Sequence, residues 1–424
     1  MKKVFAVLFT VLLVAGTAYA VDFEADGMMY VRGSAISNDS GTSNDDTASF
    51  MYYDQELDMN TRLKVTDQTL ILLNFEIHDQ DWITGNTDGQ TTSVDDVVLD
   101  EDGNPVSATG PDLDDNIEIK RTWLSHTFGT GTKLELGLMT GGTWAYSFGE
   151  TANGRWRVKV TQPIPAGTLL AILEKNAELG STNPDLKDSE KDDGDAYYVA
   201  GIFPVGDINI KPLLGYSDAS NTDLNQDSDG TKTSIFLLGV DGNLGMIGFE
   251  AEFDYLGVNE DFDGGTDYSL YGLYANGWTT LDAIKLGGQI AYGSYDDDDD
   301  VQAGYGFGED YTPTIFGADW TGIGSTTNSE YYAVTLFQVY GDYTASEQLS
   351  FHGSITYWLS NEKDTFWEDA TGYEVDLSGD YKITDNVTYT VAGAWAQFNL
   401  DEDSAGYDDA DAAYRIYHKF TVDF

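Results

Sequence analysis

The chain has 424 residues, no cysteine, and a formal net charge of −52 from 73 acidic and 21 basic residues. The lack of cysteine excludes a disulfide scaffold and cysteine-ligated metal sites, and the negative charge excludes electrostatic binding of nucleic acid or of an anionic membrane surface. A disordered acidic protein is also excluded, because such chains lack aromatic residues and this one contains 13%, including 27 Tyr.

Residues 1–20 have the organisation of an export signal. Lys2 and Lys3 precede an apolar run over 4–14, and Ala18-Tyr19-Ala20 provides small residues for cleavage. The run is about half the roughly 20 residues that a membrane-spanning helix needs. We predict a signal peptide over 1–20, cleaved after Ala20, and one mature domain over 21–424. No comparable apolar run occurs in that domain, so it can cross a membrane only as β-strands.

The mature domain contains about eighteen candidate strands with a period of two. The clearest is 247–255, where apolar residues occupy the odd positions and Glu250, Glu252 and Asp254 the even ones. Sixteen strands remain possible, because 167–179 and 268–278 alternate poorly. A soluble barrel or sandwich also alternates. Aromatic residues at strand ends, such as Trp156, Tyr373 and Tyr381, favour a membrane barrel because they match two interfacial belts.

The connections between these strands alternate in length. Short turns are expected near 66–68, 129–131, 163–167, 205–207, 241–243, 279–282, 344–348 and 384–386. Long loops are expected near 37–48, 83–114, 140–153, 180–195, 217–231, 257–267, 295–329, 360–371 and 401–411. This pattern predicts an all-β fold, a transmembrane antiparallel up-and-down β-barrel with short periplasmic turns and long extracellular loops.

Charged residues on the polar faces are the candidate pore-lining residues. Arg155, Arg157 and Lys159, here called the basic ladder, follow the loop 140–153 and are predicted to form a basic wall of the constriction; the alternative is a solvated strand end. Closure of the barrel would place further cations together on its first, second and last strands, namely Arg32, Arg62, Lys64, Arg415 and Lys419. The acids expected around the ring from them are Glu250, Glu252, Asp254, Glu374 and Asp376. Such segregated charge would create a transverse field across the pore.

The acidic loops are expected to be solvated, with the run Asp296 to Asp300 as the extreme case. Binding of Ca²⁺ to these extracellular loops is the alternative, because hard cations prefer several carboxylate oxygens. The stretch 225–230 resembles the start of a calcium loop, but Phe236 stands where a bidentate Glu is needed. No resident cofactor is expected. No enzymatic activity is expected either, because hydrolase, metalloprotease and phosphate-loop motifs are missing.

The chain ends on an amphipathic strand, 414–424, with Phe420, Val422 and Phe424 on its apolar face. It resembles the last strand of bacterial outer-membrane barrels, whose terminal aromatic residue is read by the barrel assembly machinery. We therefore predict these three residues as an assembly signal.

The signal peptide, the strands 28–34, 119–124 and 132–138, and Phe424 together resemble a Gram-negative general porin. The resemblance is one of organisation over 21–424. It implies a water-filled outer-membrane channel for passive diffusion of small hydrophilic solutes and ions. It also implies a homotrimer in contact with outer-membrane lipid and lipopolysaccharide.

In such porins the loop after the fifth strand folds inward, and here that loop is 140–150. It is shorter than usual and carries one acid, so 83–114 or 295–329 could share the narrowing. The alternatives are a substrate-specific outer-membrane channel, which would need an aromatic track with Trp358 and Phe398 as candidates, and a secreted carbohydrate-binding β-protein.

Overall fold

The computed structural model of the chain describes residues 22–37, 49–81, 98–99, 105–107, 117–142, 144–146, 148, 154–178, 193–219, 230–260, 265–297, 303–307, 311, 331–363, 365, 368–399 and 412–424. The predicted signal peptide lies outside these residues. Within them, no helix is long and apolar enough to cross a membrane.

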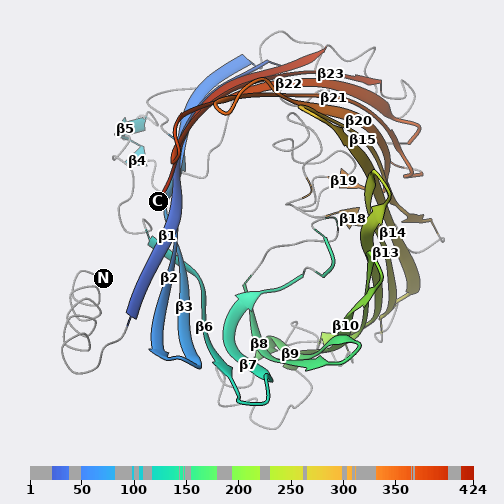
Figure 1. Ribbon diagram of the computed structural model, residues 1–424. Helices are drawn as coiled ribbons and strands as arrows, with labels where there is room; N and C mark the ends of the chain where they lie inside the picture. Colours follow the sequence, from blue (N-terminus) through green and yellow to red (C-terminus); the bar gives the residue numbers. More distant parts are fainter. Residues whose placement is uncertain are drawn as a thin grey trace.

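Eighteen antiparallel strands form one sheet that closes on itself (Figure 1). Closure follows from β1 (Asp22–Ser37), which pairs with β2 (Ser49–Thr66) on one side and with β24 (Ala413–Asp423) on the other. The ring continues in chain order through β3 (Thr69–Asp81), β6 (Ile117–Thr127), β7 (Lys133–Thr140), β8 (Gly154–Ile164), β9 (Gly167–Glu178), β10 (Asp193–Val205), β11 (Ile208–Ala219), β12 (Thr231–Leu244), β13 (Ile247–Glu260), β14 (Asp267–Leu281), β15 (Ile284–Gly293), β20 (Val334–Thr344), β21 (Leu349–Ser360), β22 (Thr371–Thr384) and β23 (Val387–Asn399).

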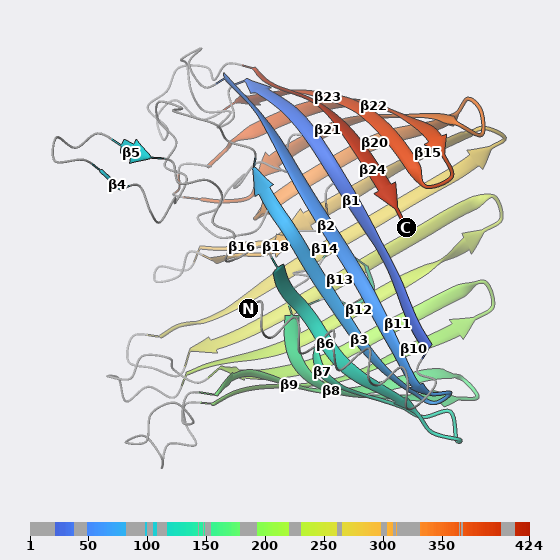
Figure 2. The ribbon, with the colours of Figure 1, turned by 90° about the vertical axis from the view of Figure 1, so that its left-hand side faces the viewer.

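The predicted fold class is confirmed, and the strand number is eighteen. Both segments that alternate poorly are strands, β9 and β14, and each pairs with its neighbours on both sides. Figure 2 shows the short turns gathered at one rim of the barrel, here called the turn rim; the other ends of the strands lie at the opposite rim.

Two predicted turns are misplaced. β12 continues through residues 241–243 to Leu244, and the turn is formed by Gly245 and Met246. Gly245 has a φ of 67°, a left-handed conformation that glycine adopts without steric cost. Likewise β14 extends to Leu281, and the chain turns at Asp282, which has a φ of 52°. In both places an Asp or Thr next to the turn resembles a turn residue although it belongs to a strand.

The two faces of the barrel wall follow from the alternation. Large apolar side chains on the outer face are strongly exposed, as shown by Val199 at 61% and Ile416 at 62%. An outer surface of this kind is suited to hydrocarbon and unfavourable in water. On β8, Trp156 and Val158 are exposed on the outside, whereas the basic ladder is half-buried on the inside. The inner face is therefore the polar one.

The seam between β1 and β24 includes the end of the chain. The backbone amide of Gly27 donates to the Phe424 carbonyl at 3.0 Å, and the Phe424 amide donates to the Gly27 carbonyl at 3.0 Å. The Phe424 ring lies against Gly27, where a Cβ would approach it to 2.8 Å. Phe424 thus takes part in barrel closure.

Three two-stranded sheets accompany the barrel among the described residues: β4 (Val98–Leu99) with β5 (Pro105–Ser107), β16 (Tyr295–Asp296) with β17 (Ala303–Gly304), and β18 (Gly306–Phe307) with β19 (Tyr331–Tyr332). Figure 1 places β18 and β19 inside the ring, and β4 and β5 outside it. Chain between β15 and β20 therefore occupies part of the lumen.

Candidate channel lumen and constriction

The chain after β7 leaves the wall and crosses into the lumen. Gly142, with a φ of 83°, follows the end of the strand and allows the change of direction. Residues 144–146 and 148 then reach the inner face of β11 to β14. Gly239 on β12 makes this approach possible, because a Cβ there would lie 2.1 Å from the Cβ of Ala145. We call residues 144–146 and 148 the first inward segment.

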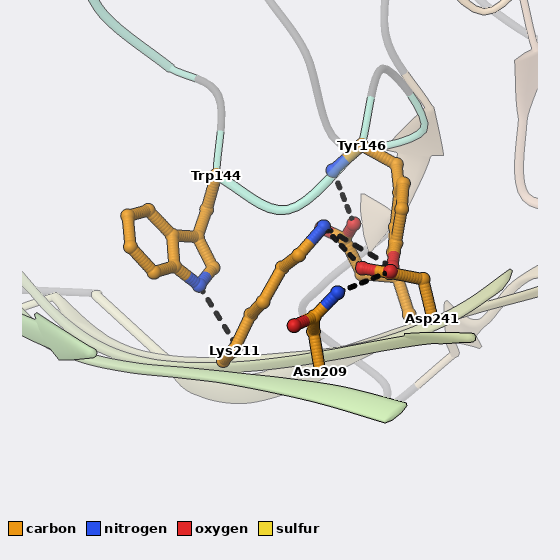
Figure 3. Close-up of polar contacts among 6 residues, drawn as sticks. Trp144, Tyr146, Asn209, Lys211 and Asp241 are labelled. Carbon is orange, nitrogen blue, oxygen red and sulfur yellow. Dashed lines mark hydrogen bonds and ion pairs between the residues drawn. The ribbon is translucent and has the colours of Figure 1, made fainter. Parts of the chain in front are cut away.

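Polar contacts hold the first inward segment to the wall (Figure 3). The Trp144 indole N–H donates to the Lys211 carbonyl at 2.8 Å, and the Tyr146 hydroxyl donates to Asp241 at 2.9 Å. Asp241 also forms an ion pair with Lys211 at 2.6 Å and accepts a hydrogen bond from Asn209 at 2.8 Å. The Lys211 ammonium lies 4.4 Å from the centre of the Tyr146 ring. Burial raises the pKa of Tyr146, and the hydrogen bond to Asp241 raises it further, so the phenol remains a donor.

Two neighbouring acids on β13, here called the acid pair, connect two separate inward segments. Glu252 accepts a hydrogen bond from the Tyr146 backbone amide at 2.9 Å, and Asp254 accepts one from the Tyr305 hydroxyl. Tyr305 belongs to the second inward segment, residues 303–307 and 311, which lies between β15 and β20 in the chain. The side chains of the acid pair are 1% and 0% exposed. The acid pair therefore fixes both segments to one place on the wall.

An aromatic cluster joins the two segments. The Phe148 ring, which is completely buried, has its centre 5.5 Å from Tyr274, 5.9 Å from Tyr305, 5.1 Å from Phe307 and 5.6 Å from Tyr311. Gly272 accommodates the cluster, because a Cβ there would lie 2.5 Å from the Tyr305 ring. Both 140–150 and 295–329 thus contribute residues to the lumen. Of 83–114, the described residues lie only in β4 and β5, outside the ring.

The two aromatic residues that the sequence suggested as an accessible track are buried. Trp358 and Phe398 are on the inner face, with ring centres 5.4 Å apart, but only 2% and 1% of these residues is exposed. The Trp358 ring covers Gly372 on the neighbouring strand. These two rings belong to a buried core inside the barrel, so they do not form an accessible track.

The basic ladder is accompanied by acids on adjacent strands. Arg157 forms an ion pair with Glu174 on β9 at 2.5 Å, and Lys159 forms one with Glu135 on β7 at 3.1 Å. Glu135 also pairs with Lys133 at 2.7 Å. Counter-charges beside the ladder reduce the repulsion between its like charges.

Three of the five cations at the seam form ion pairs, and the other two lie near tyrosine rings. Arg32 contacts Asp54 at 2.6 Å, Arg62 contacts Asp26 at 3.2 Å, and Lys64 contacts Asp67 at 2.9 Å. Arg415 is 1% exposed, with its guanidinium 5.5 Å from the Tyr417 ring, and Lys419 has its ammonium 5.6 Å from the Tyr30 ring.

The acids predicted to lie around the ring from the seam divide into two groups. Glu250 and the acid pair are on β13, which is across the ring from β1 and β2 (Figure 1). Glu374 and Asp376 are on β22, separated from β24 by β23 alone, so their predicted placement is wrong. The register sets Asp376 beside Ala394 and Ala394 beside Arg415. Charges of both signs therefore alternate around the wall, in place of two segregated halves.

The acidic loops give no metal site among the described residues, where no group of three or more His, Asp or Glu could hold an ion. Asp297 pairs with Lys363 at 2.5 Å. Residues 298–300, most of the stretch 225–230, and the loop 401–411 are outside the described part of the chain. Binding of Ca²⁺ there stays a prediction.

Three residues of the constriction were not identified from the sequence. Lys211 is the only charged residue in 208–216, and this isolation was a signal by which it could have been chosen as a candidate. Asp241 was assigned to a turn, and Tyr305 contacts a strand 51 residues earlier in the chain, a pairing that no local pattern indicates.

No protein-family model and no curated protein matches the chain. Several solved structures, in contrast, match the chain. OccK9 (OpdG) of Pseudomonas aeruginosa has a TM-score of 0.55 at 11% identity, covering 95% of this chain and 99% of that one. OccK2 (OpdF) of the same organism has a TM-score of 0.55 at 9% identity, with coverages of 95% and 98%. OccAB3 of Acinetobacter baumannii has a TM-score of 0.54 at 10% identity, with coverages of 95% and 100%. The chain therefore has the fold of these solved structures over nearly its whole length, which confirms the predicted barrel and the porin resemblance at the level of fold.

Proposed function

We propose that the protein is a substrate-specific outer-membrane channel, through which particular small hydrophilic solutes cross passively. The observation that carries this proposal is that both inward segments are hydrogen-bonded to the acid pair. Two inward segments, joined through the buried Phe148 ring, narrow the lumen on the β11 to β14 side. A solute must then pass close to wall groups, whose hydrogen bonds can discriminate between solutes.

The charge distribution supports selectivity over general diffusion. In this proposal the pathway is lined by the half-buried basic ladder and the half-buried or exposed seam cations on one part of the wall and by the half-buried Glu250 on another. The acid pair, Glu374, Asp376 and the seam cation Arg415 are buried, so they act by holding and orienting the groups around them. Most of the described cations have an acid within ion-pair distance. The wall therefore presents oriented polar groups to a passing solute and does not produce a strong net electric field across the lumen.

The test is solute uptake by proteoliposomes as a function of solute concentration. A specific channel gives uptake that saturates for one class of solute and is competitively reduced by its members. A general diffusion porin gives uptake that rises linearly for every solute below a size limit. Linear uptake for neutral, anionic and cationic solutes alike would overturn the proposal.

A further inference from the structure

Next to the constriction, toward the turn rim, the inner face of β14, β15 and β20 carries two aromatic side chains around a lysine. Trp278 follows Tyr274 and Asn276 on the inner face of β14, and it pairs in register with Gly287 on β15. Tyr340 on β20 pairs with the same Gly287 from the other side. The Lys285 ammonium lies 5.2 Å from the Trp278 ring centre and 5.5 Å from the Tyr340 ring centre. Trp278, Lys285 and Tyr340 form a patch here called the aromatic platform.

Each ring of the platform lies against a glycine of a neighbouring strand. A Cβ at Gly248 would approach the Trp278 ring to 2.5 Å, and a Cβ at Gly287 would approach the Tyr340 ring to 2.3 Å. A ring in this position has one face on the backbone and presents the other to the lumen. Unlike Trp358 and Phe398, both residues are only half-buried. The platform is therefore accessible to a solute in the channel.

A row of polar side chains borders the platform on the constriction side. The Tyr340 hydroxyl donates to the Asn276 side-chain carbonyl at 3.0 Å, and the Asn276 amide donates to Glu250 at 3.3 Å. In the same row, Gln289 donates to Gln338 at 2.8 Å, and Gln338 donates to Thr356 at 2.8 Å. These bonds fix the amide planes. They leave the Gln289 carbonyl without a protein partner among the described residues, and the Asn276 carbonyl, which accepts one hydrogen bond from Tyr340, has a second lone pair, so both oxygens can bind a solute.

This combination of groups matches the surface of a sugar ring. A pyranose has a face of C–H bonds, which packs on an aromatic ring, and a rim of hydroxyls, each of which both donates and accepts hydrogen bonds. The platform supplies the apolar surface. Fixed amides, a carboxylate and an ammonium at its edges supply acceptors and donors in the same small area. A small anion or cation would use the charged edges and gain little from two ring faces.

We propose that the aromatic platform is a binding subsite for a neutral pyranose sugar that passes through the channel. The inference rests on the proposed function and names the substrate class of that channel. The sugar ring stacks on Trp278 and Tyr340 just beside the constriction, and its hydroxyls bond to Asn276, Gln289 and Lys285.

The experiment combines two readouts with glucose and maltose as probes. Binding to the detergent-purified protein is measured by saturation-transfer NMR, and reduction of the ion current by added sugar is measured in planar bilayers. We expect saturable binding and a saturable current reduction by at least one of the two sugars. Potassium glutamate at the same concentration, with the ionic strength matched, should not reproduce the effect.

Three variants locate the site. Trp278→Ala and Gly287→Ala should each weaken sugar binding about tenfold, the first by removing a ring and the second by lifting the Tyr340 ring off the wall. Trp395→Ala is the matched control, because Trp395 packs on Tyr373 on the outer face of the barrel; it should bind sugar like the wild type. Heat-modifiable migration in gels confirms that each variant is a folded barrel.

The possible outcomes distinguish a failure of the proposed sugar subsite from a failure of the proposed channel function. A wild-type protein that conducts ions but shows no saturable sugar binding overturns the subsite and leaves the channel intact. Saturable block by glutamate and not by sugar also overturns it, in favour of an anionic solute. Sugar binding by NMR in a protein that never conducts would uphold the platform and overturn the proposed function.

Discussion

The Phe148 ring offers the sharpest test of the constriction, because it is the contact shared by both inward segments. Replacement by Ala removes a completely buried ring from among Tyr274, Tyr305, Phe307 and Tyr311. Truncation of a buried Phe costs about 3–5 kcal/mol. Phe148 lies outside the barrel strands, so this cost falls on the packed arrangement of the lumen segments and leaves the strand ladder intact.

A loss of this size lowers the ratio of packed to unpacked lumen segments by roughly two to three and a half powers of ten. The polar contacts of Trp144 and Tyr146 remain, so the first inward segment is expected to fluctuate while still attached. Single-channel recordings in planar bilayers should show a larger mean conductance and more current noise for Phe148→Ala than for the wild type. Neutral polymers that are excluded from the wild-type pore should enter the variant.

Phe148→Leu is the matched control, because it retains most of the apolar volume and should remain close to the wild type. The reasoning is refuted if Phe148→Ala folds, as judged by heat-modifiable migration, and has wild-type conductance, noise and polymer exclusion. The narrowest part of the pore would then lie elsewhere.

Replacing the basic ladder with Gln leaves Glu174 and Glu135 with fewer counter-charges and should move the reversal potential in a KCl gradient toward cations. Replacing Asp296 to Asp300 with Asn should move it much less, because water and salt screen exposed charges over about 8 Å; the opposite ranking would show that the loops control selectivity. Deleting Phe424 removes its two backbone hydrogen bonds to Gly27 at the seam and should slow outer-membrane insertion, seen as less heat-modifiable protein; an unchanged amount would contradict the assembly signal. Burial raises the pKa of Glu362, which lies just beyond β21, to about 7, against a hydrogen bond from Thr365 that lowers it. Since the folded pKa is raised, the protonated acid stabilises this connection fully below about pH 4.5, and the stabilisation is lost as the pH rises through about 7. Amide hydrogen exchange near residues 361–363, corrected for the intrinsic effect of pH, should therefore be faster at pH 8 than at pH 5, and Glu362→Gln should abolish that difference.

The barrel could be predicted from the sequence because membrane strands obey a local rule. Alternation on 247–255 and on 154–160 separates an apolar outer face from a charged inner face, and connection lengths order the strands around the ring. Closure then brings Arg32 and Lys419 into register as neighbours, although they are far apart in the chain.

The constriction could not be predicted in the same way, because it depends on contacts between distant segments. The hydrogen bond from Tyr305 to Asp254 and the fit of Ala145 over Gly239 leave no periodic signal. Asp241 shows the limit of local rules most clearly. Its sequence Asp-Gly-Asn is typical of a hairpin turn, yet the residue lies in a strand, paired with Lys211 and Asn209. Glu374 and Asp376 were assigned to the correct face but placed too far from the seam, although the chain order of the strands already puts β22 only two strands before β24.

The central claim is that this barrel is a water-filled channel narrowed by its own inward segments. The most direct measurement is the single-channel conductance of the purified wild-type protein in planar bilayers over a series of KCl concentrations. We expect discrete steps whose size follows the bulk conductivity, together with exclusion of neutral polymers much smaller than an unobstructed barrel lumen of this strand number would admit. Absence of conductance steps, or entry of polymers as large as an unobstructed lumen admits, would contradict the claim.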